Sequence, residues 1–104
     1  MKVYIHDISN AGTKFTEYFN IPYQHKKVKG FFIYGDSSNT KIGLKIASKE
    51  IIPNGFDAKL IEFNGYLPIA DITFPCDEAG LDAPVELNID RAVANSLRLY
   101  FIVE

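Results

Sequence analysis

The sequence contains one cysteine, two histidines, no tryptophan and no long apolar run. Cys76 has no partner for an internal disulfide, and one cysteine with two histidines excludes an all-cysteine zinc site and any site with paired cysteines. The longest apolar runs, such as residues 99–103, are far shorter than the roughly 20 residues of a membrane-spanning helix. We therefore expect stability from packing alone, with no metal, no cofactor and no membrane partner. No apolar core of a signal peptide follows Lys2, so we do not expect secretion by that route.

Neither sign of charge dominates the chain. Eleven lysines and arginines stand against thirteen acidic residues, which gives a net charge of −2 and disfavours general binding to nucleic acid. The 104 residues are 47% hydrophobic, which is ordinary for a folded protein and too apolar for a disordered chain. This length predicts a single domain over residues 1–104.

The strongest pattern in the sequence is an alternation of apolar and polar residues with period two. It is clearest in 40–48, 85–90 and 97–103, and the last of these has apolar residues on both faces, as a central strand does. Weaker strands are predicted at 2–8, 13–19, 28–34, 58–63 and 66–74. Turns are predicted at 35–39, at Pro53-Asn54-Gly55 and at Asn64-Gly65, the last as a hairpin.

These elements predict the fold class. Many short strands with frequent turn signals favour an all-β domain, a single compact β-sandwich or jelly-roll-like structure of about eight short antiparallel strands. Asp90 is a suitable N-cap for one short helical turn near residues 90–96.

The two halves of the chain carry opposite charge. Residues 1–52 sum to +4 and residues 53–104 to −6. Such halves can form one solvated, mixed surface, or they can form complementary patches for assembly. On the second interpretation the partner-binding residues are three lysines on one patch and three acids on another. They are Lys26, Lys27, Lys29, Asp77, Glu78 and Asp82.

Two further patterns have chemical alternatives. Cys76 with His6 or His25 has the residue types of a thiol and its base, although a lone cysteine at a strand end is more often a small buried side chain. The acidic loop 71–82 offers oxygen ligands to a hard cation, but its spacing matches no calcium loop, so a solvated acidic loop is the favoured interpretation. We therefore do not predict an enzyme.

Lysines lie beside aromatic residues at the start of one predicted strand. Lys29, Gly30 and Phe31 are similar to the Lys-Gly-Phe-Gly-Phe-Ile strand of cold-shock proteins, although Phe32 stands where that strand has its second glycine. This similarity, together with six tyrosines, keeps open a small binding module for single-stranded nucleic acid or carbohydrate.

The run VELNIDRAVANSLRLYFIV over residues 85–103 predicts a closing strand, a short turn and a final strand. With the pattern of the whole chain, it resembles the small β-sandwich auxiliary, or decoration, capsid proteins of tailed phages, including those of gut Bacteroidetes such as the crAss-like group. The resemblance implies a non-enzymatic structural protein of the virion, made in the host cytoplasm, that attaches to the capsid or joins other virion subunits through loops and strand edges. Its partners would be other protein subunits, with self-association as a further option.

Overall fold

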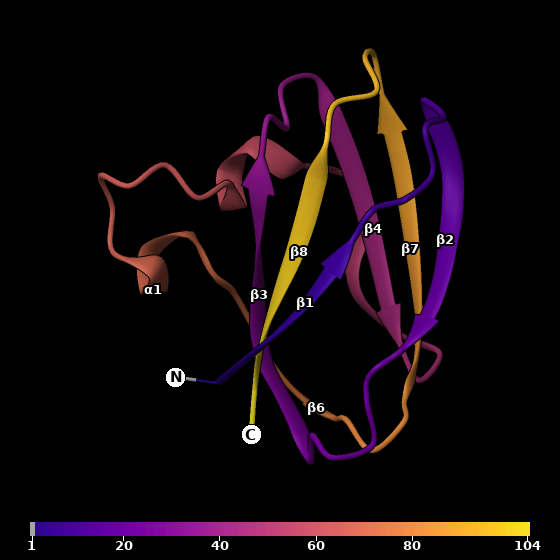
Figure 1. Ribbon diagram of the computed structural model, residues 1–104, viewed down its shortest axis with the longest axis vertical. Coiled ribbons are helices and arrows are strands. Elements are labelled where there is room, and N and C mark those ends of the chain that lie inside the picture. The colour runs from indigo at the N-terminus through magenta and orange to yellow at the C-terminus, as the bar shows by residue number, and fades with distance from the viewer. Residues whose placement is uncertain (1) are drawn as a thin grey trace.

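A computed structural model describes residues 2–104, without the side chain of Ala79. Eight strands form two four-stranded antiparallel sheets that pack face to face, so the predicted all-β sandwich is confirmed (Figure 1). Sheet A has the order β1-β8-β3-β6 and sheet B the order β2-β7-β4-β5. The strands are β1 (Lys2–Asp7), β2 (Lys14–Asn20), β3 (Lys27–Gly35), β4 (Thr40–Ile46), β5 (Lys49–Asp57), β6 (Phe74–Ala79), β7 (Pro84–Arg91) and β8 (Leu97–Val103). Within the described residues, no helix is long and apolar enough to cross a membrane.

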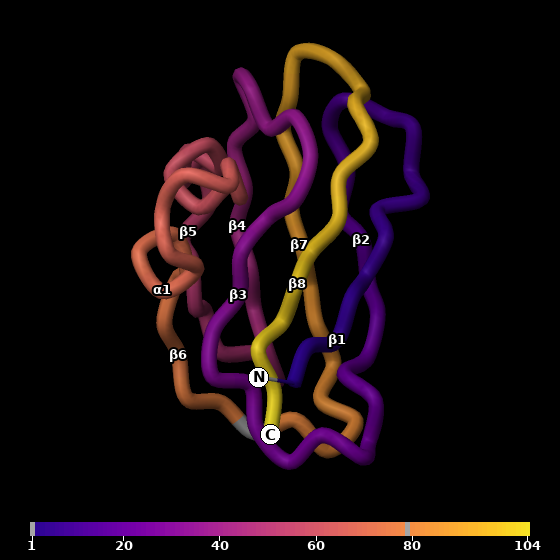
Figure 2. Tube along the Cα trace, turned by 60° about the vertical axis from the view of Figure 1, so that its left-hand side comes forward, coloured from indigo at the N-terminus to yellow at the C-terminus, as the bar shows by residue number. Residues whose placement is uncertain are grey.

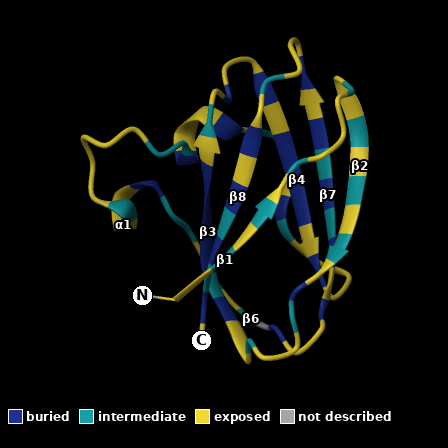
Figure 3. Cartoon of the chain, viewed as in Figure 1, coloured by how far each residue is buried: buried dark blue, intermediate teal, exposed yellow. Residues whose placement is uncertain are grey.

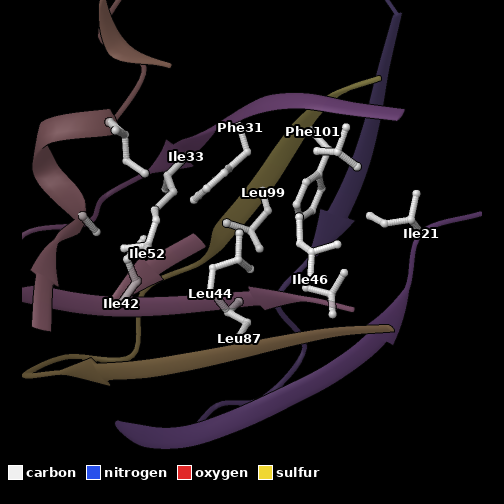
Figure 4. Packing of buried hydrophobic residues seen from close by; sticks show 14 of the residues in the cluster. Ile21, Phe31, Ile33, Ile42, Leu44, Ile46, Ile52, Leu87, Leu99 and Phe101 are labelled. Carbon is white, nitrogen blue, oxygen red and sulfur yellow. The ribbon is translucent and has the colours of Figure 1, made fainter. Parts of the chain in front are cut away.

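The core lies between the two sheets and follows the period of two in the sequence. Figure 3 shows buried residues alternating with intermediate or exposed ones along β7 and β8. Leu97, Leu99, Phe101 and Val103 of β8 all belong to the buried cluster. Figure 4 shows the side chains of sheet A, such as Phe31, facing those of sheet B, such as Leu44. Apolar residues at every second position therefore bury one face of each strand.

The segment between β5 and β6 differs from the prediction. Residues 58–63 and 66–74 do not form two strands joined by a hairpin at Asn64-Gly65. They contain a short 3-10 helix, η1 (Ala58–Ile61), and a single helical turn, α1 (Ile69–Ile72), and they lie along one side of the sandwich (Figure 2). Asn64 explains the difference, because its side-chain oxygen accepts the backbone N–H of Tyr66 at 2.8 Å and of Leu67 at 3.1 Å. These bonds replace the ladder of a hairpin.

Two other local predictions were wrong. The helical turn near residues 90–96 is absent because β7 continues through Arg91, whose backbone N–H donates to Thr13 O at 2.8 Å. Asp90 therefore takes a place in sheet B rather than capping a helix. Residues 53–55 lie inside β5, where the register against β4 shifts between Ile42 and Leu44 and Gly55 has φ +94°. This irregularity bends an edge strand without ending it.

Candidate functional site

The structure brings part of the predicted partner-binding set together where β3 pairs with β6. Lys27 Nζ and Lys29 Nζ lie 3.5 and 3.2 Å from Asp77 Oδ1. The hydrogen bond from Lys29, and then the charge of Lys27, lower the pKa of Asp77. Basic and acidic residues therefore face one another on neighbouring strands, which corrects the expectation of two separate patches.

The other three residues of the set are placed apart. Glu78 pairs with Lys49 of β5 at 2.8 Å. Asp82 accepts two hydrogen bonds from Asn20 Nδ2, through its backbone oxygen at 3.0 Å and its carboxylate at 3.2 Å. Lys26 has an exposed side chain, and its backbone N–H donates to Glu104 O at 2.7 Å. Partner binding by these six residues stays a prediction.

The opposite charges of the two halves meet as ion pairs on the surface of the sandwich. Five ion pairs join a lysine of residues 1–52 to an acid of residues 53–104. Three of them are Lys41 with Asp57, Lys45 with Glu86 and Lys49 with Glu78. The strands of the two halves alternate in sheet A, and in sheet B β7 of the second half lies between β2 and β4 of the first, so the halves interleave in space instead of forming two poles.

Among the described residues, no hydrogen bond joins Cys76 to His6 or to His25, whose backbone N–H donates to Pro22 O at 3.0 Å. Cys76 Sγ donates to the backbone oxygen of Val28 at 3.5 Å, whereas His6 Nε2 is hydrogen-bonded to Glu17 at 2.7 Å. Burial, with added repulsion from Glu78 and Asp77, raises the pKa of Cys76 to about 11. The thiol is therefore protonated near neutral pH, when it is a weak nucleophile. Among residues 2–104, no three His, Cys, Asp or Glu side chains converge as metal ligands.

The pKa of Cys76 predicts slow alkylation of the native protein. A shift from 9.0 to about 11 reduces the thiolate fraction near pH 8 about 100-fold. We expect iodoacetamide to modify the folded chain about 100-fold more slowly than the chain unfolded in guanidinium chloride. Mass spectrometry at timed intervals measures both rates, and equal rates would contradict the buried, protonated thiol.

Phe31, which matches the cold-shock strand, and Phe32, which stands where that strand has a glycine, point in opposite directions. Phe31 is fully buried in the core, where its ring lies 5.9 Å from that of Phe101. Phe32 pairs with Tyr100 across sheet A and so lies on the outer face, where it is only 4% exposed. Neither ring is open to stack on a base. Phe32 instead belongs to a group of apolar side chains that cover the outer face of sheet A.

This group, here called the aromatic face, is built by cross-strand pairing. Val3 lies opposite Ile102, and Ile5 lies opposite Tyr100, which in turn pairs with Phe32. All of these residues alternate with side chains that enter the core. The members of the aromatic face are Val3, Ile5, Phe32, Tyr34, Phe63, Tyr100 and Ile102.

Four rings form the centre of the aromatic face. Phe32 stacks on Tyr100 with a centroid distance of 5.0 Å, and Tyr34 lies 6.0 Å from Tyr100. Phe63 reaches the face from the segment between β5 and β6 and lies 5.7 Å from Tyr34. Its backbone N–H donates to Ile33 O at 2.7 Å, which fixes the segment to the edge of β3. Val3, Ile5 and Tyr34 remain exposed.

A charged pair lies at one end of the aromatic face. Arg98 of β8 pairs in register with Asp7 of β1, and Arg98 Nε donates to the Asp7 carboxylate at 2.8 Å. The neighbouring strand contributes Tyr34, opposite Arg98. The face is thus apolar along β1, β8 and β3 and polar at this end, and an apolar centre with a polar margin is the usual plan of a protein interface.

Glu62 holds the segment that carries Phe63. Its carboxylate accepts the backbone N–H and the hydroxyl of Ser37, at 2.7 and 2.9 Å, and lies 2.8 Å from Lys59 Nζ. Burial alone would raise the pKa of Glu62, but the hydrogen bonds from Lys59 and Ser37 outweigh it and lower the pKa from its ordinary value of 4.5. Ser37 is fully buried, so water cannot replace the Glu62 carboxylate as the acceptor of its hydrogen bonds.

Glu62→Gln is expected to destabilise the fold in a pH-dependent way. At pH 7 we expect a loss of about 1–2 kcal/mol, because the bonds from Ser37 lose their charged acceptor and Lys59 loses its ion pair. Because the folded pKa is lowered, this stability is present above the unfolded pKa of 4.5 and is lost as the pH falls through the folded value. Urea unfolding at pH 7 and pH 3 measures the difference between wild type and variant, which should shrink at pH 3. A difference that is equal at both pH values would contradict the account, and exposed Glu50→Gln is the matched control.

Comparisons with models of protein families, with curated proteins and with solved structures find no match to this chain. The function must therefore be argued from its side chains. Sequence reasoning named charged residues and missed the aromatic face. The signal was present, because Leu97–Val103 is apolar on both faces although β8 has the core on only one side.

Proposed function

We propose that this protein is a non-enzymatic structural subunit of a phage virion that docks on capsid or other virion proteins through the aromatic face. The observation that carries the docking proposal is the cluster of four rings with exposed Val3 and Ile5 beside it on the outer face of sheet A. Aromatic residues are enriched at the centres of protein interfaces, and contiguous exposed apolar patches mark such sites.

The edge of sheet A extends this docking surface. β1 pairs with β8 on one side and has no other strand neighbour in the sheet. An edge strand offers unpaired backbone groups to a second chain. Val3 and Ile5 lie on this strand, so a partner that contacts the aromatic face also reaches the open edge. The proposal thus combines a sheet face with the strand edges expected from the sequence.

The resemblance of residues 85–103 to decoration proteins supports the choice of a virion among possible assemblies. In the structure this run comprises β7, a loop and β8, one strand from each sheet. β8 supplies Tyr100 and Ile102 to the aromatic face. The part of the sequence that resembles virion proteins is therefore also part of the proposed docking surface.

Mass spectrometry of tailed-phage particles from a host that carries the gene tests the proposal. We expect the chain to band with the particles at a constant ratio to the major capsid protein. The double variant Ile5→Lys, Tyr34→Lys should no longer be found with the particles, because it places two charges in the apolar centre of the interface. Tyr66→Lys is the matched control, because Tyr66 is 93% exposed and lies outside the aromatic face. Absence of the wild-type chain from particles would contradict a virion role, and retention of the double variant would contradict docking through this face.

A further inference from the structure

The outer face of sheet B differs in character from the aromatic face. Its residues pair in polar rows that cross the sheet. In the middle row Thr16 of β2 lies opposite Asn88 of β7, which lies opposite Gly43 of β4. Asn54 of β5 completes this row, because its side-chain oxygen accepts a hydrogen bond from Asn88 Nδ2 at 3.1 Å.

Gly43 leaves room in the middle row for the side chain of Asn54. A Cβ at this position would collide with the side-chain amide of Asn54, so the amide lies directly over the glycine. The space above the row is a hollow of about 390 Å³. Lys14 and Asp90, which pair across β2 and β7, line its far end, together with Lys41 of β4. This volume is in the range of small-molecule sites.

A second hollow continues the first along the same strands. Its volume is about 240 Å³, and its lining includes Tyr18, Glu86 and Lys45. These three residues form the next row of sheet B, two residues along each strand from Thr16, Asn88 and Gly43. Three successive rows span about 14 Å at the rise of a β-strand. The two hollows therefore lie on adjoining rows of the same face, and together they are here called the sheet B groove. Their combined length suits an extended ligand.

The groove contains both donors and acceptors of hydrogen bonds, and bonds within the protein orient them. Thr16 Oγ1 donates to Asn88 Oδ1 at 2.6 Å, and Asn88 Nδ2 donates to Asn54. Within the described residues, these bonds leave one N–H of Asn88 and both N–H groups of Asn54 available for a ligand, with Asp90 as an acceptor beside them. A ligand that matches them must both donate and accept hydrogen bonds at short intervals, as the hydroxyl groups of a sugar do.

The charges of the groove are balanced within the protein. Lys41 lies 4.0 Å from Asp57, Lys45 lies 3.6 Å from Glu86, and Lys14 pairs in register with Asp90. The groove therefore has no excess charge to hold an anion or a cation. The Tyr18 side chain is 71% exposed at the second hollow and offers an apolar ring face beside the polar row.

We propose that the sheet B groove binds a neutral oligosaccharide, with the Thr16, Asn88 and Asn54 row holding hydroxyl groups and Tyr18 packing against a sugar ring. This inference does not rest on the proposed docking function, because the groove lies on the opposite side of the sandwich from the aromatic face. A subunit docked through sheet A would keep the groove open to solvent. The protein would then present a saccharide site on the surface of the assembly.

An NMR titration of the ¹⁵N-labelled protein tests the inference. The probes are maltotriose, cellotriose and the trimer of N-acetylglucosamine, each added up to about 10 mM. With at least one of them we expect saturable shifts in the backbone amides of Thr16, Gly43 and Asn88. No saturable shift with any of the three, or shifts confined to other parts of the chain, would overturn the inference. Tighter binding of trigalacturonic acid would overturn the neutral character of the ligand.

Variants then assign the binding to the groove. Asn88→Ala and Tyr18→Ala should each weaken binding about tenfold or more, since each removes a hydrogen-bonding or stacking contact. Tyr66→Ala, at a tyrosine that is exposed but outside the groove, should bind as the wild type does. If Asn88→Ala loses its native spectrum, Tyr18→Ala decides, because that ring is exposed. Unchanged affinity in Tyr18→Ala, or an equal loss in Tyr66→Ala, would contradict the assignment.

Discussion

Phe101→Ala should cost about 3–5 kcal/mol of the free energy of unfolding, which is the usual cost of removing a buried aromatic ring. Phe101 is fully buried, and its ring lies 6.0 Å from Tyr4, 5.9 Å from Phe19 and 5.9 Å from Phe31. Phe19 comes from sheet B and the other two from sheet A. The ring therefore joins the sheets, and its removal leaves a cavity between them.

Urea unfolding monitored by circular dichroism measures this loss as a lower midpoint with an unchanged slope. Phe101→Leu should lose clearly less than Phe101→Ala, because leucine fills part of the cavity. Tyr66→Ala, at a fully solvated tyrosine, should change stability by less than about 0.5 kcal/mol. A loss below about 1 kcal/mol in Phe101→Ala would contradict the central place of this ring in the core.

Arg91→Met should cost about 2–3 kcal/mol, because a buried cation ties together two loops. Arg91 is only 5% exposed, and its guanidinium donates to the backbone oxygens of Asn10 and Gly12, both at 3.0 Å, and of Asn95 at 2.9 Å. Its guanidinium carbon also lies 5.3 Å from the centroid of the Phe15 ring. Methionine keeps most of the volume and none of these donors.

Arg91→Lys separates charge from geometry. A lysine keeps the positive charge, but its compact ammonium cannot reach three carbonyl groups that the planar guanidinium spans, so we expect less than half of the loss to be restored. Hydrogen exchange should increase in residues 8–13 and 92–96 of both variants, where the bonded carbonyls lie. Full recovery of stability in Arg91→Lys, or unchanged hydrogen exchange in these loops, would contradict the claim that the Arg91 guanidinium holds the two loops together.

Most strands can be predicted from the alternation of apolar and polar side chains. The other parts of the fold depend on local hydrogen bonds, which this alternation does not show. Ile42, Leu44 and Ile46 predict β4 because every second residue enters the core. The hairpin that follows turns at Ala47 and Ser48 with φ of 51° and 66°, a conformation that the sequence would assign to Asn-Gly. The Asn-Gly pair of the sequence, Asn64-Gly65, does not form a hairpin, because the Asn64 side chain accepts hydrogen bonds from the backbone of the residues that follow.

The candidate site was less predictable because it depends on which strands become neighbours. Lys29 and Asp77 are 48 residues apart in sequence, and only the pairing of β3 with β6 brings their side chains to 3.2 Å. The aromatic face likewise combines β1, β3 and β8 with Phe63 from a segment that was expected to be a strand. The sequence showed that β8 has apolar residues on both faces. It did not show which strands pair with β8.

Hydroxyl-radical footprinting of the protein in assembled particles tests most directly whether the aromatic face is the docking surface. The side chains of Tyr34, which is 48% exposed in the free chain, and of Ile5 should be protected in the particle. Tyr18 and Tyr66, at 71% and 93% exposed, should react as they do in the free protein. Equal modification of Tyr34 and Ile5 in the free and assembled states would contradict the account.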